Sequence, residues 1–196
     1  MDAWETERLY LRRFENTDRD VYYQRIYADP EVMKTLPTGK PMAREDFESR
    51  VTRLMVDHWR EHGFGPWVVV HKADQALIGH CGLKYWPDSP EVEVFYALAK
   101  PYWGQGLATE GARASLRYGF EERQLDHIIA AAFIDNVASR RVLEKIGMTY
   151  TGETTFAGLT VAGYMIRRET YASPRVRGFS DTMPESKKVC PLSLAP

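Results

Sequence analysis

The sequence predicts a mixed α/β domain, in which a central sheet of six to seven strands is accompanied by about four helices. Alternating runs in the first half indicate antiparallel strands, and His127–Ile134 is apolar at successive positions, as in a strand buried on both faces. A helical pattern that begins at Ala108 lies between this run and the strand-like Glu91–Ala99. Strand, turn, helix and buried strand in this order form a βαβ unit, so the sheet should be mixed.

The composition indicates an ordinary globular protein. With 196 residues, 44% hydrophobic and 27% charged, the chain is long enough for one domain with a sizeable core. A net charge of −1 gives no global reason to expect nucleic acid as a partner. Cys81 and Cys190 do not make a disulfide framework, and no stretch resembles a signal peptide or a membrane span. We therefore expect a cytoplasmic monomer or homodimer without direct nucleic-acid or membrane partners.

The N-terminal quarter predicts one strand and one short helix. Glu5–Phe14 alternates between apolar and polar residues and should form a half-buried first strand. Asn16 or Thr17 offers an N-cap for the helix that follows, and Asp29-Pro30 should end that helix.

A second helix and a hairpin follow. The helix is predicted by one apolar stripe, formed by Phe47, Val51, Leu54, Met55 and His58. Gly63 supplies its C-terminal stop. Trp67–His71 and Ala76–Leu83 are strand-like and are separated by four polar or small residues, which predicts an antiparallel pair.

After the buried strand the pattern predicts one more helix and a last pair of strands. Asp135-Asn136 can cap a helix that Gly147 ends, and Met148–Glu153 and Val161–Tyr171 are strand-like. From position 172 to 196 there is no periodicity and there are several prolines. We therefore expect a single domain over residues 1–171 and a flexible C-terminal tail over residues 172–196.

The stretch from Pro101 to Gly111 connects the Glu91–Ala99 strand to the helix that begins near Ala108. Gly104 and Gly106 allow a turn that aims backbone N–H groups at an anion, beside the partial positive charge of a helix N-terminus. Many tight turns also need two glycines. By itself, the stretch is compatible with a phosphate cradle and with an ordinary turn.

Four motifs in order resemble the GNAT N-acetyltransferases, and within them the branch of the Rim-type ribosomal-protein N-terminal acetyltransferases. The motifs are Ile78-Gly79-His-Cys-Gly82-Leu83, Glu93-Val-Phe-Tyr96, Tyr102-Trp103-Gly104-Gln105-Gly106-Leu-Ala108-Thr109-Glu110, and Asn136-Val-Ala-Ser139 with Leu143-Glu144-Lys145-Ile-Gly147-Met148. The similarity extends from about Glu5 to Tyr171. It implies a GNAT fold and an acetyl-CoA-dependent N-acetyltransferase, which acts on a protein N-terminal α-amine or a small-molecule amine by direct attack in a ternary complex.

By this resemblance, the acyl donor acetyl-CoA lies where the strands Glu91–Ala99 and His127–Ile134 splay apart. The implied cofactor-binding residues are Tyr96, Leu98, Ala99, Trp103, Gly104, Gln105, Gly106, Leu107, Ala108, Thr109, Asn136, Ser139, Arg141 and Lys145. Trp103 departs from the Gln or Arg of the general family motif, which removes a possible side-chain donor. Main-chain groups of Leu98 and Ala99 would pair with the pantetheine as an added strand does. Arg140 and Arg141, with Lys145, form a local basic cluster that would meet the 3′-phosphate and the pyrophosphate, or would form a solvated helix face balanced by Glu144.

Two residues are candidates for catalysis. Glu93 is the candidate general base because a carboxylate is the strong proton acceptor on the strand beside the implied acetyl position. Its alternative role is that of a solvated strand residue. Ser139 occupies the family position near the coenzyme sulfur, or bonds to its own helix start. Asn136 can cap that helix, touch the pantetheine, or do both.

The sequence also offers signals for three other interpretations. The main rival is a GNAT-like module that binds acyl-CoA as a sensor or partner and transfers nothing. A Rossmann-type nucleotide-binding domain is disfavoured because the third glycine of G-x-G-x-x-G is absent and antiparallel strands precede the turn. His58-Trp-Arg-Glu61-His62 matches an inverted zinc-protease pattern, but it stops at Gly63 without an evident third ligand. No metal is expected.

Overall fold

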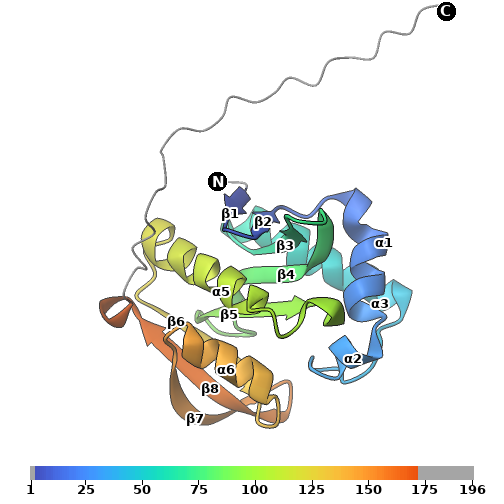
Figure 1. Ribbon diagram of the computed structural model, residues 1–196. Helices are drawn as coiled ribbons and strands as arrows, with labels where there is room; N and C mark the ends of the chain where they lie inside the picture. The colour runs from blue at the N-terminus through green and yellow to red at the C-terminus, as the bar shows by residue number, and fades with distance from the viewer. Residues whose placement is uncertain (1–2, 172–196) are drawn as a thin grey trace, which may run out of the picture.

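The computed structural model describes residues 3–171, so the tail expected over residues 172–196 lies outside the described residues. One mixed sheet of eight strands runs through the described chain in the order β1-β2-β3-β4-β5-β6-β8-β7 (Figure 1). The strands are β1 (Ala3–Glu5), β2 (Leu9–Arg12), β3 (Pro66–His71), β4 (Ala76–Tyr85), β5 (Val92–Leu98), β6 (His127–Phe133), β7 (Thr149–Phe156) and β8 (Leu159–Arg167). All pairs are antiparallel except β5 with β6.

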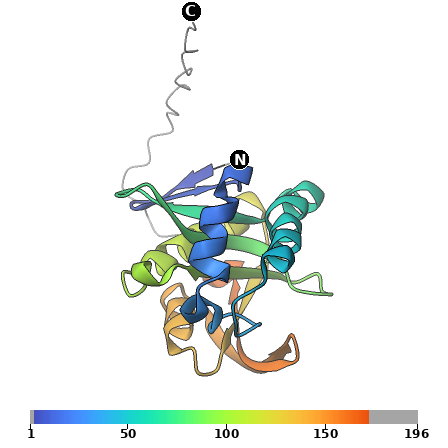
Figure 2. The same ribbon diagram turned by 90° about the vertical axis from the view of Figure 1, so that its right-hand side faces the viewer.

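The helices cover both faces of the sheet. They are α1 (Arg19–Tyr22), α2 (Pro30–Met33), α3 (Arg44–Val51), α4 (His58–His62), α5 (Leu107–Arg117) and α6 (Val137–Lys145). The π-helical turns η2 (Tyr23–Tyr27), η3 (Thr52–Asp57) and η5 (Tyr118–Glu122) extend α1, α3 and α5, and short 3-10 turns are η1 (Asn16–Asp18), η4 (Lys100–Tyr102) and η6 (Arg168–Thr170). Figure 2 shows α1 and α3 on one side of the sheet and α5 on the other.

Two clusters of buried side chains correspond to these two faces. Leu9 and Leu11 of β2 belong to the cluster under α5, together with Leu116. Val68 of β3 belongs to the second cluster, with Tyr22 of α1 and residues of α3. Both faces of the central strands are therefore covered, which explains why their sequences carry long apolar runs.

The predicted mixed sheet and βαβ unit are confirmed. Between β5 and β6 the only paired position of the described strands is Glu93 opposite Ile129, and beyond it the two strands part. Gly63 ends α4 in a left-handed conformation with φ of 69°, as the sequence predicted. The Asn136 side chain accepts a hydrogen bond from the Ser139 N–H at 3.0 Å, which makes it the N-cap of α6.

Two local predictions were incomplete. The single strand expected over Glu5–Phe14 is a hairpin, in which β1 and β2 flank a turn closed by the Thr6 N–H on the Leu9 carbonyl at 3.0 Å. The eighth strand comes from this hairpin. Asp29-Pro30 begins α2 in addition to ending the preceding helix, because the Asp29 carboxylate accepts the Glu31 N–H at 2.8 Å.

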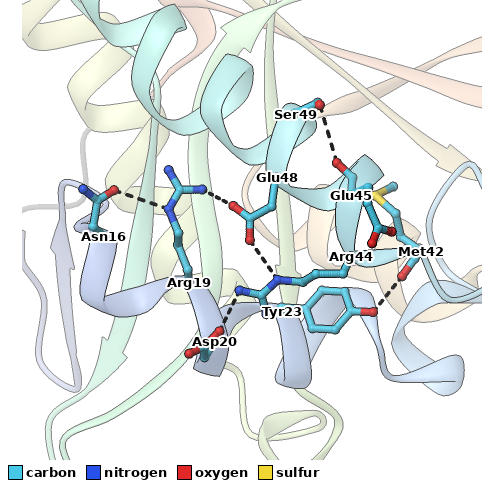
Figure 3. A network of polar contacts seen from close by, with 9 residues as sticks. All are labelled: Asn16, Arg19, Asp20, Tyr23, Met42, Arg44, Glu45, Glu48 and Ser49. Carbon is cyan, nitrogen blue, oxygen red and sulfur yellow. Dashed lines mark hydrogen bonds and ion pairs between the residues drawn. The ribbon is translucent and has the colours of Figure 1, made fainter.

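A network of charged side chains ties α1 to α3 (Figure 3). Arg19 donates to Glu48 at 2.5 Å, and Glu48 also accepts from Arg44 at 2.8 Å. Arg44 reaches back to Asp20 at 2.6 Å and lies over the ring of Tyr23. Most members are partly exposed, so each pair stabilises the fold only modestly. Their joint effect is to fix α3, which contributes Arg50 to the lining of the cleft described below, against α1.

Within residues 3–171, no helix is long and apolar enough to cross a membrane. The same part of the chain contains no group of three or more His, Cys, Asp or Glu side chains arranged to hold a metal ion.

Candidate active site

A cleft of about 410 Å³ opens where β5 and β6 part. Its floor is formed by strand residues from both sides of the gap, among them Phe95 and Ala132. The turn before α5, α6, the loop after α2 and α3 also contribute residues to its lining. All the residues that the sequence assigned to the donor site line this cleft except Ala99 and Gln105.

The glycine turn forms one end of the cleft. Gly104 and Gly106 have φ values of 73° and 79°, and Gly106 is the N-cap of α5. The first N–H groups of any α-helix have no intrahelical partner, and in α5 no described side chain caps them. Leu107, Ala108 and Thr109 of this first turn line the cleft. Unpaired N–H groups at a helix N-terminus suit a phosphate, so this end fits the pyrophosphate of a coenzyme.

The turn is held from outside by the N-terminal hairpin. Glu110 accepts the Arg8 backbone N–H at 2.8 Å, the Arg8 Nε at 2.7 Å and the Thr6 hydroxyl at 2.5 Å. Arg8 also donates to the Gln105 carbonyl at 2.9 Å. Burial raises the pKa of Glu110, but the hydrogen bonds from Thr6 and Arg8 outweigh it and hold that pKa below its ordinary value. Glu110 therefore anchors the start of α5 as a carboxylate.

Three residues that the sequence assigned to acetyl-CoA binding are engaged in hydrogen bonds within the protein. The Trp103 indole N–H donates to the Leu98 carbonyl at 2.6 Å, so the tryptophan that replaces the family's Gln or Arg is fixed against β5. The Ala99 N–H donates to the Ile78 carbonyl at 2.7 Å. This N–H is consequently engaged within the sheet, and the expectation that it pairs with pantetheine is not supported. The Gln105 side chain bonds to the Pro101 carbonyl at 2.9 Å, and Gln105 does not line the cleft, so its predicted part in binding the donor is not supported.

Ser139 and Tyr96 meet across the cleft. The Tyr96 hydroxyl lies 3.0 Å from the Ser139 hydroxyl and donates to the Ser139 carbonyl at 3.2 Å. Burial raises the pKa of Tyr96, so the phenol stays protonated. Asn136 fixes the position of Ser139 by accepting its N–H. The pair thus places two O–H groups at the first turn of α6, within the lining of the cleft.

The basic residues of α6 separate into two groups. Arg141 and Lys145 line the cleft on the same side as the glycine turn. Arg140 instead bonds to the Tyr164 hydroxyl at 3.0 Å and to the Ile134 carbonyl at 3.2 Å, outside the cleft lining. Arg141 and Lys145 therefore remain as the cations that suit coenzyme phosphates.

Glu93 is buried at the point where β5 leaves β6, and it lines the cleft. Lys84 lies opposite Glu93 in the β4–β5 register and forms an ion pair with it. Burial raises the pKa of Glu93 above its ordinary value, and the charge and hydrogen bond of Lys84 oppose that rise. A carboxylate with a raised pKa at the edge of a cleft is well suited to take a proton near neutral pH. The interpretation of Glu93 as a solvated strand residue is thus wrong.

Sequence reasoning missed Lys84 and His80, which share the Glu93 face of the sheet. His80 is buried in the cleft wall, and its Nδ1 lies 2.8 Å from the Tyr22 hydroxyl. Burial, followed by the charges of Arg50 and Lys84, lowers the pKa of His80 to about 3. The alternation of β4 and its hairpin relation to β5 carry the only sequence signal, because they place Lys84 and Glu93 on the same face.

The zinc-like pattern in α4 has another role. His58 Nδ1 lies 2.8 Å from the Phe64 carbonyl, and its Nε2 accepts the Tyr85 N–H at 3.1 Å. Both ring nitrogens are therefore used in closing the C-terminal end of this helix against neighbouring loops.

With this geometry established, similarity to known proteins decides the family. The model of the acetyltransferase (GNAT) domain matches residues 8–149. The chain belongs to the GNAT acetyltransferase family. This match confirms the resemblance seen in the motifs, and it covers both the glycine turn and Glu93.

Three known acetyltransferases are similar to this chain in sequence or in structure. The chain is 33% identical over 159 residues to the FsC-acetyl coenzyme A-N(2)-transacetylase of Aspergillus fumigatus. The aligned region covers 77% of this chain and 66% of that protein. The crystal structure of a GNAT acetyltransferase from Bacillus anthracis is 29% identical, with a TM-score of 0.72 over 85% of this chain and 99% of that chain. The ribosomal-protein-S5-alanine acetyltransferase of Vibrio fischeri is 19% identical, with a TM-score of 0.70 over 88% and 100%. The Rim-type neighbour therefore shares the fold.

Proposed function

We propose that this GNAT domain transfers the acetyl group of acetyl-CoA to a primary amine, either a protein N-terminal α-amine or a small-molecule amine, by direct attack in a ternary complex. The observation that supports this proposal most directly concerns Glu93. Its carboxylate is buried, has a raised pKa and lines the cleft where β5 and β6 part. A module that only binds acyl-CoA would have no need for a buried carboxylate at this point.

The residues of the cleft fit acetyl-CoA. The N–H groups at the start of α5 and the side chains of Arg141 and Lys145 suit its phosphates. When bound, the co-substrate supplies an activated thioester. The sheet gap beyond Glu93 would receive the pantetheine through strand groups that β5 and β6 do not use for each other.

Each side chain has a defined part in the transfer. The attacking amine nitrogen forms the new C–N bond while the C–S bond breaks, and Glu93 takes the proton that the nitrogen loses, directly or through a water. The Ser139 and Tyr96 hydroxyl pair would donate to the departing thiolate. An α-amine with a pKa of about 8 is roughly one-tenth neutral at pH 7, whereas a lysine amine is neutral at only a few parts in ten thousand. A carboxylate base therefore suits an N-terminal or other low-pKa amine.

The test is amine-dependent thiol release, measured with acetyl-CoA and a broad panel of amines and peptides. Glu93→Gln should lower the amine-dependent kcat about a hundredfold or more, because the variant keeps the shape but cannot accept the proton. The affinity for acetyl-CoA, measured by calorimetry, should change little. Glu91→Gln is the matched control, since Glu91 is two residues away, pairs with His127 and does not line the cleft.

Two results would contradict the proposal in different ways. Equal rates for the Glu93→Gln and Glu91→Gln variants would show that Glu93 is not the base. Tight coenzyme A binding with no acetylation of any amine would favour the non-catalytic acyl-CoA sensor.

A cytoplasmic location and a monomeric or homodimeric state remain predictions from the sequence.

A further inference from the structure

The charges that line the cleft are unbalanced. Among the described residues, four cationic side chains line it, namely Arg50, Lys84, Arg141 and Lys145, and Glu93 is the one carboxylate. A cleft with this balance attracts anions and repels cations. Coenzyme phosphates account for only part of the excess, because Arg50 and Lys84 come from other elements than the glycine turn and α6.

Three of these four cations, Arg50, Arg141 and Lys145, form no ion pair within residues 3–171, and Arg50 is the one of them that does not belong to α6. Lys84 is already paired with Glu93. On α3 itself, Arg44 pairs with Glu48 and Asp20, as Figure 3 shows. Arg50 lies six residues further along, and within residues 3–171 it has no ion pair. Its exposed side chain, together with that of Leu54 one turn later, lines the cleft.

The charge of Arg50 reaches the bottom of the cleft. After burial, it is the next largest influence that lowers the pKa of His80, and it also acts to lower that of Tyr22. With a pKa of about 3, His80 is uncharged near neutral pH, so it neither attracts an anion away from Arg50 nor neutralises the charge of Arg50. Among the described residues that line the cleft, the one carboxylate, Glu93, is paired with Lys84, so no lining carboxylate is left to neutralise Arg50.

Other residues of the cleft wall are apolar or aromatic. Trp86 of the β4–β5 loop and Phe156 at the end of β7 pack with ring centroids 4.7 Å apart and ring planes tilted by 57°. Leu36 and Pro37 line the cleft from the loop after α2. Such walls lower the local dielectric and strengthen an ion pair formed between them. They also suit the flat or aliphatic body of an acceptor.

We propose that the acceptor amine carries a carboxylate, which Arg50 binds while the amine is directed to Glu93. This inference rests on the proposed function and specifies its acceptor class. The carboxylate belongs either to a small amino acid-like molecule or to an acidic residue close to a peptide N-terminus. Acceptors with several positive charges are disfavoured, because Arg50 and Lys84 repel them and Glu93 is already paired.

The experiment compares acceptors that differ only in this charge. Initial rates are measured for para-(aminomethyl)benzoate against para-(aminomethyl)benzamide, and for tetrapeptide amides with aspartate or asparagine at their second position. The wild type should show a higher kcat/KM for the carboxylate member of at least one pair, and which pair responds distinguishes the small-molecule source from the peptide source. Arg50→Gln should reduce that preference about tenfold to a hundredfold, through KM, since one charge-assisted hydrogen-bonded contact is lost.

Arg53→Gln is the matched control. Arg53 is exposed on the same helix and does not line the cleft, so its variant should keep the wild-type preference. Arg50→Glu should invert the preference toward a diamine. Equal kcat/KM for both members of each pair, or an unchanged preference in Arg50→Gln, would overturn the inference even if acetylation occurs.

A binding measurement separates this inference from the proposed function. The quenching of tryptophan fluorescence is titrated in the coenzyme A complex, where Trp86 and Trp103 report on the cleft. If no amine is acetylated, the proposed function fails, but the benzoate should still bind more tightly than the benzamide and lose that advantage in Arg50→Gln. Equal binding of the two compounds would show that Arg50 does not recognise a carboxylate.

Discussion

Lys84 and Glu93 lie directly opposite each other on β4 and β5 and form an ion pair inside the cleft. The pair makes the proton affinity of Glu93 a result of two opposing effects, in which burial raises its pKa and Lys84 lowers it. The lysine therefore keeps a buried carboxylate available in its ionised form.

Removing this lysine should shift the pH dependence of catalysis. Lys84→Met leaves burial as the dominant influence, so the pKa of Glu93 rises further. Because Glu93 must be ionised to accept a proton, the acid limb of the plot of kcat/KM against pH should move to higher pH, and the rate at pH 7 should fall. Lys84→Arg should restore most of the wild-type profile. An acid limb at the same pH in Lys84→Met would show that Glu93 is not the group that titrates.

The anchor at the start of α5 should stabilise the fold in a pH-dependent way. The folded-state pKa of Glu110 is lowered from its ordinary 4.5, so its contribution is present above that value and is lost as the pH falls below it. Glu110→Gln should cost about 1–3 kcal/mol in urea unfolding at pH 7 and raise the KM for acetyl-CoA, because the Gln105 turn loosens.

The control for this prediction is Glu121→Gln. Glu121 forms a half-exposed pair with Arg117 on the next turns of the same helix, and its loss should cost less than about 1 kcal/mol. Equal losses of stability in the two variants would show that Glu110 has no special anchoring role.

A third prediction concerns the close approach of β4 to β5. A Cβ atom at Gly79 would lie 2.1 Å from the Ala97 carbonyl oxygen, and the φ of Gly79 is 149°. Gly79→Ala should therefore destabilise the protein by 2 kcal/mol or more, at roughly the upper end for single substitutions. Gly158→Ala, at a φ of 77° with no atom within 4 Å, should cost only about 1 kcal/mol of backbone strain. Urea unfolding of both variants gives the comparison.

His80 should contribute its own pH dependence of stability. Its pKa is about 3 in the folded protein and 6.5 ordinarily, so below pH 6.5 the unfolded chain binds a proton that the folded chain does not. Stability should fall with decreasing pH between 6.5 and 4.5, with a slope of up to about 1.4 kcal/mol per pH unit. His80→Gln should flatten the slope in this window, because the variant has no imidazole to bind the proton in the unfolded chain. An unchanged slope in His80→Gln would contradict the burial argument.

Most of the fold was predictable because its signals are local. Alternation, the apolar β6 run and the glycine stops are properties of short windows, and they gave the strands, the βαβ unit and the end of α4. The short hairpin at the N-terminus was not predictable in the same way. Its turn is held by Glu110, about one hundred residues away along the chain, and a local window contains no sign of that partner.

The features of the candidate site also separate into those set by neighbours in the chain and those set by tertiary packing. The sequence by itself determined the glycine turn, the N-cap Asn136 and the position of Glu93 on its strand, because each depends on neighbours in the chain. Only the tertiary structure decided that Glu93 is buried and paired with Lys84, that the Ala99 N–H is used within the sheet, and that Arg50 faces the cleft without a counter-charge. Burial and charge pairing depend on the packing of distant elements, and these two quantities set proton affinity and ligand charge.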